Sequence, residues 1–157
     1  MFTTKGRYAL RIMADLAVHD GWVSLGDVSR RQGISRKYLE QVASPLLKAG
    51  YIEGRRGKGG GYRLTREPGA YTLGEILRAA EEGTLAPVSC LDCSTGELCP
   101  RAEECATMPV WRDLGALTSS YLDGKHLSDI LEPAGADADD ATDDRTVDGS
   151  GAPRDAE

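Results

Sequence analysis

Residues 24–64 constrain the fold more than any other stretch of the sequence, because short apolar patterns alternate there with strong start and stop signals. The segment SLGD has Ser24 at an N-cap position and Asp27 three residues later, which is typical of a capping box. Gly33 suits the left-handed conformation that ends a helix, and Ser35 can cap the next helix. The pattern therefore predicts two short helices joined by the tight turn RQGIS.

A glycine-rich basic hairpin is predicted directly after these two helices. The sequence YIEGRRGKGGGYRLT has short apolar-aromatic runs at its ends and a flexible basic tip between them. Helix, turn, helix and basic hairpin in this order are typical of a winged helix-turn-helix, so the predicted fold class is mainly α (α+β). Capped patterns predict further helices over about residues 3–20 and 72–83. A later helix is predicted from the apolar stripe Val110, Trp111, Leu114, Leu117 and Tyr121, which ends at Gly124.

Positive charge is concentrated in the part of the chain that carries these motifs. Residues 1–66 hold 13 Lys and Arg against 5 Asp and Glu, a net of +8, although the whole chain carries −6. A basic segment in an acidic protein indicates one anion-binding face. In a winged helix-turn-helix the second helix of the motif enters the major groove, and the hairpin reaches phosphates or the minor groove. We predict DNA contacts from Ser35, Arg36, Lys37, Tyr38 and Gln41 on the helix and from Arg55, Arg56 and Lys58 on the hairpin.

For any one of these charges, a solvated surface with no role in binding is the alternative. An enzyme is the least favoured class, because neither His19 nor His126 stands beside an obvious Ser, Cys or carboxylate set. The N-terminus lacks the apolar core of a signal peptide, and no apolar run approaches the roughly 20 residues of a membrane span. We therefore expect a cytoplasmic protein without membrane contact, in which thiols stay reduced.

All four cysteines are crowded into one segment, with the spacing Cys90-x2-Cys93-x5-Cys99-x5-Cys105. Thiolates this close form a soft ligand set for zinc, copper(I) or an iron–sulfur cluster. A structural zinc site usually has two C-x2-C pairs, and this chain has one. A disulfide or a free-thiol sensor is a further alternative, and the spacing alone does not choose among them.

Several stretches together resemble the IscR and NsrR family of bacterial winged-helix transcription regulators. They are MFTTKGRYA, RQGISRKYLEQV, RRGKGGGYRL and WRDL, and the resemblance covers about residues 1–132. It implies a homodimer, paired through the helix after the cysteines, that binds double-stranded promoter DNA. It also implies an iron–sulfur cluster, with [2Fe–2S] favoured over [4Fe–4S], whose x5, x5 ligand spacing fits Cys93, Cys99 and Cys105. The function implied is regulation of transcription in response to cluster status, redox state or nitric oxide; a cluster-free or zinc-binding regulator and a redox protein are the alternatives.

The fourth ligand is where the sequence departs from this family. IscR-like proteins use a histidine three residues after the last cysteine, and Met108 stands there. NsrR-like proteins use a carboxylate near the N-terminus of the partner subunit. The corresponding residue here is Tyr8, and no Asp or Glu precedes Asp15. Cys90 is therefore the favoured substitute, and an all-cysteine site is expected to have a lower reduction potential.

These patterns divide the chain into four parts. After Pro133 the composition collapses to mainly Ala, Asp, Gly, Thr and Pro, which cannot bury enough surface to fold. The predicted parts are a DNA-binding domain at 1–83, a cysteine-rich loop at 84–108, a dimerisation helix with a short terminal helix at 109–132, and a disordered acidic tail at 133–157.

Overall fold

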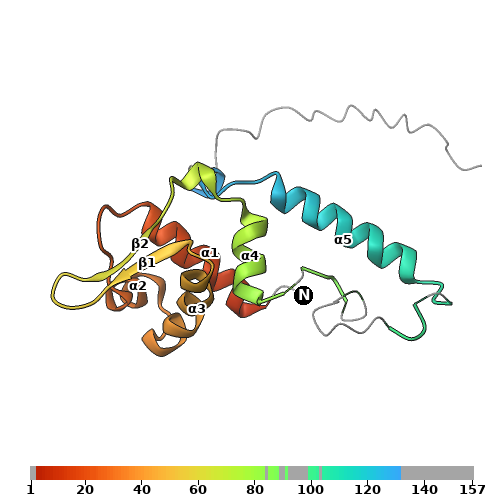
Figure 1. The fold of residues 1–157 in the computed structure, drawn as a ribbon, viewed down its shortest axis with the longest axis horizontal. Coiled ribbons are helices and arrows are strands. Elements are labelled where there is room, and N and C mark those ends of the chain that lie inside the picture. The colour runs from red at the N-terminus through yellow and green to blue at the C-terminus, as the bar shows by residue number, and fades with distance from the viewer. Residues whose placement is uncertain (1–2, 84, 89–90, 92–98, 103, 132–157) are drawn as a thin grey trace, which may run out of the picture.

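The computed structural model describes residues 3–83, 85–88, 91, 99–102 and 104–131. Cys90, Cys93 and the predicted tail lie outside the described residues. The elements confirm a mainly helical α+β fold with one antiparallel hairpin (Figure 1). In chain order they are α1 (Thr4–Ala17), α2 (Leu25–Gln32), α3 (Arg36–Lys48), β1 (Ile52–Arg55), β2 (Gly61–Leu64), the 3-10 turn η1 (Pro68–Ala70), α4 (Leu73–Glu81), α5 (Met108–Asp123) and the 3-10 turn η4 (Ser128–Ile130).

The turn between α2 and α3 forms as its capping residues predict. The Ser24 side chain accepts a hydrogen bond from the Asp27 N–H, and the Ser35 side chain accepts one from the Tyr38 N–H. Gly33 takes a left-handed conformation, with φ 65° and ψ 30°, and ends α2. Because both helix starts are satisfied by their own side chains, the helix-turn-helix geometry is encoded locally.

The core lies where the first four helices meet the base of the hairpin. Tyr71, just before α4, is fully buried, and its hydroxyl donates to the Tyr51 carbonyl at 2.8 Å. The same hydroxyl accepts from the Arg66 N–H at 2.7 Å, so it ties the end of the hairpin to α4. The other fully buried large side chains are Ile12, Met13, Val28, Leu39, Val42, Leu46, Ile52, Ile76 and Leu127.

A single backbone pairing adds a third chain segment to the hairpin. Val23 and Tyr62 exchange two backbone hydrogen bonds, of 2.9 and 2.8 Å. Gly61 makes this approach possible, because a Cβ there would lie 2.4 Å from the Val23 carbonyl oxygen. Its φ of 155° also disfavours other residues. The loop before α2 is thereby fixed against β2.

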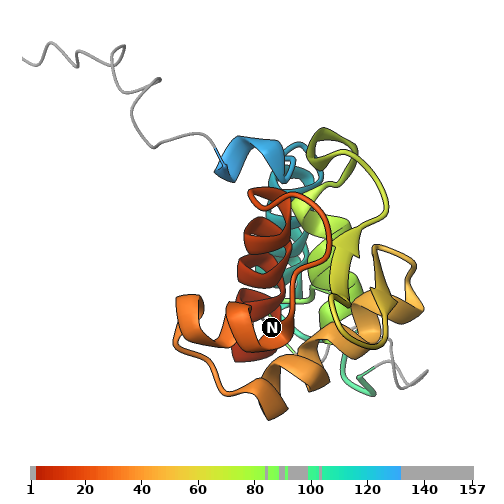
Figure 2. The same cartoon turned by 90° about the vertical axis from the view of Figure 1, so that its left-hand side faces the viewer.

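Helix α5 extends away from the rest of the chain (Figure 1). Viewed from the end of the winged part in Figure 2, it lies behind that part. Most of its apolar stripe is uncovered: Leu117 is 69% exposed and Tyr121 is 65% exposed, whereas Trp111 is half-buried. Its last residue is anchored, because Asp123 accepts hydrogen bonds from both terminal nitrogens of Arg78, at 2.6 and 2.8 Å. The predicted stripe therefore forms, but within one described chain it faces solvent.

Candidate DNA-binding surface and cysteine site

The N-terminal half of α3 presents most of its predicted DNA-contacting side chains to solvent. Ser35, Arg36, Lys37 and Gln41 are exposed. The Ser35 oxygen accepts the capping bond from the Tyr38 N–H at 3.3 Å, which leaves its hydroxyl hydrogen free to donate to a base or phosphate. This surface is therefore open to a ligand without any rearrangement of the helix.

Tyr38 differs from the other predicted contacts on α3. It is half-buried, and its ring packs edge-to-face against Tyr8 of α1, with ring centroids 5.6 Å apart. Much of its surface is thus used to join α3 to α1, and it presents only part of its side chain to a duplex.

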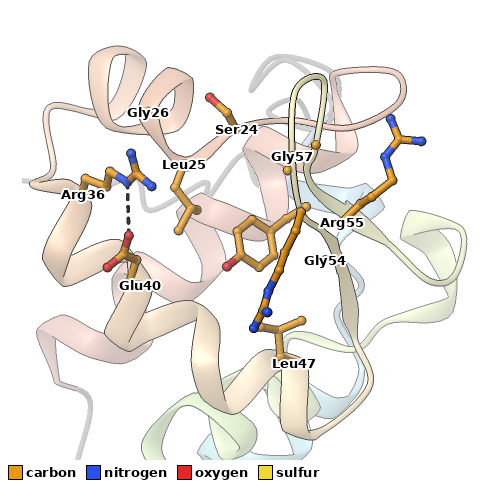
Figure 3. A pocket seen from close by; sticks show the side chains of 13 residues that line it. Ser24, Leu25, Gly26, Arg36, Glu40, Leu47, Gly54, Arg55 and Gly57 are labelled. Atoms are coloured by element: carbon orange, nitrogen blue, oxygen red, sulfur yellow. Dashed lines mark hydrogen bonds and ion pairs between the residues drawn. The ribbon is translucent and has the colours of Figure 1, made fainter.

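A groove of about 580 Å³ lies between α3 and the hairpin. Arg36 and Glu40 line its α3 side and form an ion pair, with Nε and Oε1 3.1 Å apart (Figure 3). Their side chains are 72% and 52% exposed, and such exposed pairs contribute about 0.3–0.5 kcal/mol, so Arg36 remains free to exchange Glu40 for a phosphate. Arg56 lines the groove from the hairpin.

The two neighbouring arginines of the hairpin lie in different environments. In Figure 3 the Arg55 guanidinium points away from Arg36 and Glu40. It lies over the Trp22 ring, 4.8 Å from the centroid, and donates to the Gly59 carbonyl at 2.7 Å. Lys58 is exposed in the tip of the hairpin. Arg55 and Arg56 both line the groove, but the Arg55 guanidinium is directed to the Trp22 ring.

Sequence reasoning missed two residues of this surface, Trp22 and Arg63. The Arg63 guanidinium also lies over the Trp22 ring, 4.6 Å from its centroid. The hairpin register pairs Arg63 with Glu53, and the alternation of side chains along the strands could have predicted this pair from the sequence. The position of Trp22 depends on the isolated pairing of Val23 with Tyr62, and no local pattern predicts such a pairing.

A buried carboxylate fixes the helix-turn-helix to α1. Asp15 is 4% exposed, and it accepts hydrogen bonds from Arg31 Nε at 3.1 Å and from Gln32 Nε2 at 2.9 Å. Arg11 in turn donates to the side-chain and main-chain oxygens of Gln32. Burial alone raises the pKa of Asp15, but the hydrogen bonds from Arg31 and Gln32 outweigh it and hold the pKa below its usual value. The end of α2, and hence the start of α3, is held by charge-assisted bonds.

Two of the four predicted cluster ligands, Cys99 and Cys105, lie within the described residues, and both are half-buried. The Cys105 sulfur lies 3.3 Å from the Thr107 hydroxyl. Hydrogen bonds from Thr107, and less strongly from Met108, together with the charge of Arg101, lower the pKa of the Cys105 thiol. Thiolate is the form that binds iron, so this environment fits a cationic metal group. No cluster of three or more candidate metal ligands occurs among the described side chains.

The structure also locates Met108 and Tyr8, which stand at the fourth-ligand positions of the family, and the two histidines. Met108 is 3% exposed as the first residue of α5, so its thioether belongs to the interior. The Tyr8 ring packs edge-to-face against the Tyr38 ring. His126 follows the far end of α5, and a helix from Met108 to Asp123 is about 24 Å long. His19 follows α1, and its Nδ1 lies 2.7 Å from the carbonyl oxygen of Asp15 in that helix.

Together, a helix-turn-helix with an exposed polar second helix and a glycine-rich basic hairpin define the class of winged helix-turn-helix regulators. The chain belongs to the Rrf2 family of iron-dependent transcriptional regulators, which matches residues 2–133. Among the described residues, no helix has the length and apolar character needed to cross a membrane.

Curated relatives and solved structures agree with this membership. The chain is 44% identical over 131 residues to the HTH-type transcriptional regulator IscR of Aliivibrio salmonicida, covering 82% of this chain and 76% of the relative. It is 41% identical over 131 residues to IscR of Yersinia enterocolitica, covering 82% and 77%. The IscR structure of T. potens aligns with a TM-score of 0.65 and 34% identity, covering 83% of this chain and 85% of that one.

A second solved structure with this fold is a regulator of a different name. CymR, the global cysteine regulator of B. subtilis, aligns with a TM-score of 0.66 and 35% identity, covering 83% of this chain and 95% of that one. The fold is therefore shared by differently named regulators, and it does not by itself identify the group that the cysteine segment binds.

Proposed function

We propose that this chain is a homodimeric transcription regulator that binds promoter DNA and holds an iron–sulfur cluster through Cys93, Cys99, Cys105 and Cys90. The observation that carries the proposal is the position of the described cysteines: the segment with Cys99 and Cys105 leads directly into α5. A metal group bound there is placed between a DNA-reading module and an uncovered apolar helix. Such a cluster supplies a redox- and nitric oxide-sensitive group whose ligation depends on its oxidation state.

In this proposal, different residues of the chain contact the DNA and pair the two subunits. Ser35, Arg36, Lys37, Tyr38 and Gln41 contact the major groove, and Arg56 and Lys58 reach the flanking backbone or minor groove. The exposed stripe on α5 pairs two chains, so that two copies of α3 meet an approximately palindromic operator. The hydrogen bonds from Arg31 and Gln32 to Asp15 keep the start of α3 in place during binding.

The cysteine segment is proposed to control how the two winged parts are set relative to one another. Thiolates bound to one group draw their segment together, and α5 continues from that segment. Ligation then favours one operator geometry, and its loss favours another, through a difference in affinity between two dimer states.

The test begins with anaerobic purification and measures the visible spectrum, iron, acid-labile sulfide and zinc. Charge-transfer absorption with iron and sulfide is expected, and colourless protein with stoichiometric zinc would reject the cluster. The triple variant Cys93→Ser, Cys99→Ser, Cys105→Ser is expected to lose the colour and to change occupancy of its own promoter. The single variant Cys90→Ser identifies the fourth ligand, since it should lower the cluster content or shift its spectrum.

A further inference from the structure

The outer face of the hairpin carries an arginine cluster that the proposed groove contact does not use. Arg55 and Arg63 both lie over the Trp22 ring, with guanidinium carbons 4.8 and 4.6 Å from the ring centroid. The strand register explains this arrangement, because Glu53 pairs with Arg63 and Arg55 follows Glu53 by two residues. Side chains alternate between the two faces of a strand, so all three share one face.

The backbone holds Trp22 in this position. Its neighbour Val23 is 5% exposed and exchanges two hydrogen bonds with Tyr62, so the loop continues the hairpin as a short third segment. Gly61 leaves room for the Val23 carbonyl, which a Cβ would approach to 2.4 Å. The ring is thus fixed beside β2 by buried backbone contacts, and the two arginines stack on a rigid surface.

The cluster carries uncompensated positive charge. Arg63 Nε lies 2.5 Å from Glu53 Oε1, and these side chains are 50% and 44% exposed. Arg55 instead donates to the neutral carbonyl of Gly59. Two guanidinium groups held over one ring repel each other, and one carboxylate neutralises only one of them. A further anion is therefore favoured at this cluster, and the planar fork of arginine matches a phosphate group.

We propose that Trp22, Arg55 and Arg63 form a phosphate-binding platform that grips the sugar–phosphate backbone of DNA from the outer face of the hairpin. The proposal rests on the proposed function and extends it, since Arg56 contacts the duplex from the groove side and the platform contacts it from the other side. Because Trp22 already orders both arginine side chains, they lose less conformational freedom on binding. The competing interpretation is that the stacking only stiffens the hairpin.

The two interpretations differ in the effect of Glu53→Gln. This variant removes the carboxylate that competes with phosphate for Arg63, so the platform predicts severalfold tighter DNA binding. Arg63→Gln breaks the same ion pair but removes a phosphate contact. It should weaken binding severalfold and reduce the slope of log K against log salt by about 0.9. If the stacking is only structural, both variants lose the same ion pair and act in the same direction, with an unchanged slope.

The measurement is fluorescence anisotropy of a labelled duplex from the chain's own upstream region, titrated with the full-length chain under anaerobic conditions at several salt concentrations. Trp22→Leu should weaken binding as Arg63→Gln does, because it releases both arginines from the ring. Lys125→Gln is the matched control, since it removes one positive charge outside the winged part and should leave the slope unchanged. Urea unfolding of Glu53→Gln and Arg63→Gln checks that the two variants are equally folded.

Arg56→Ala separates failure of the platform from failure of the proposed function. If Arg56→Ala weakens binding while Glu53→Gln and Arg63→Gln shift affinity in the same direction at constant slope, the platform is refuted and DNA binding stands. If the unmodified chain binds this duplex no better than an unrelated one, the proposed promoter recognition fails. If it binds neither duplex, both proposals are overturned.

Discussion

Shortening Leu117 to alanine should separate the two chains of the proposed dimer. Leu117 is 69% exposed in the single chain, at the centre of the apolar stripe of α5. Burying a whole leucine side chain contributes about 1.5–3 kcal/mol, so burying its exposed part contributes about 1–2 kcal/mol. A twofold interface contains the residue twice, which doubles the loss to about 2–4 kcal/mol. The dimer dissociation constant should therefore rise by roughly 30- to 1,000-fold.

The assay is sedimentation equilibrium over a range of protein concentrations, with the cluster state held constant. Val18→Ala is the matched control, because Val18 is 61% exposed but lies at the end of α1, outside the stripe. Its dissociation constant should equal that of the unmodified chain. The reasoning is refuted if Leu117→Ala and Val18→Ala dimerise equally well, or if the unmodified chain is monomeric at the highest concentrations.

Three further outcomes follow from individual contacts. Arg56→Ala should weaken operator binding and lower the salt slope by about 0.9, measured by anisotropy at several salt concentrations. Asp15→Asn should destabilise the chain at neutral pH. The pKa of Asp15 is lower in the folded chain than in the unfolded one, so its stabilising effect is present above the unfolded value of about 4 and is lost as the pH falls below it. The difference in free energy of unfolding between the variant and the unmodified chain, measured in urea, should therefore be smaller at pH 3 than at pH 7. Tyr71→Phe leaves the Arg66 N–H without the hydroxyl that accepts it at 2.7 Å and should lower the free energy of unfolding by about 1–3 kcal/mol in urea.

The sequence predicts the helix-turn-helix and the hairpin well because their determinants are local. Ser24, Gly33 and Ser35 each act on backbone groups within a few residues, and the structure confirms all three as caps. The contacts that the sequence did not predict are long-range. Arg31 reaches Asp15 across 16 residues, and this pairing depends on how α1 and α2 pack. A charged residue in an amphipathic pattern gives no sign of its partner before the helices are placed.

The prediction of DNA-contacting residues shows the same limit at the scale of one residue. Arg55 and Arg56 are adjacent and equally basic, so composition cannot rank them. The fold separates them, because Arg55, the last residue of β1, places its guanidinium over the Trp22 ring, a contact that depends on the pairing of Val23 with Tyr62. The apolar stripe of α5 could be predicted from the sequence, but such a stripe is equally typical of an ordinary core helix. Only the packed chain shows that Leu117 and Tyr121 remain uncovered.

The anchoring of α5 suggests how a change at the cysteines reaches the DNA-binding surface. At its C-terminal end, the helix is fixed by the paired bonds between Asp123 and Arg78. The next residues are fixed too, since the Leu73 N–H donates to the Lys125 carbonyl at 2.8 Å and the Leu127 N–H donates to the Tyr71 carbonyl at 2.9 Å. A pull on the cysteine segment therefore acts at the opposite end of a rigid helix, about 24 Å away. We expect α5 to pivot about its anchored end, which changes the spacing of two winged parts in a dimer while leaving each of them folded.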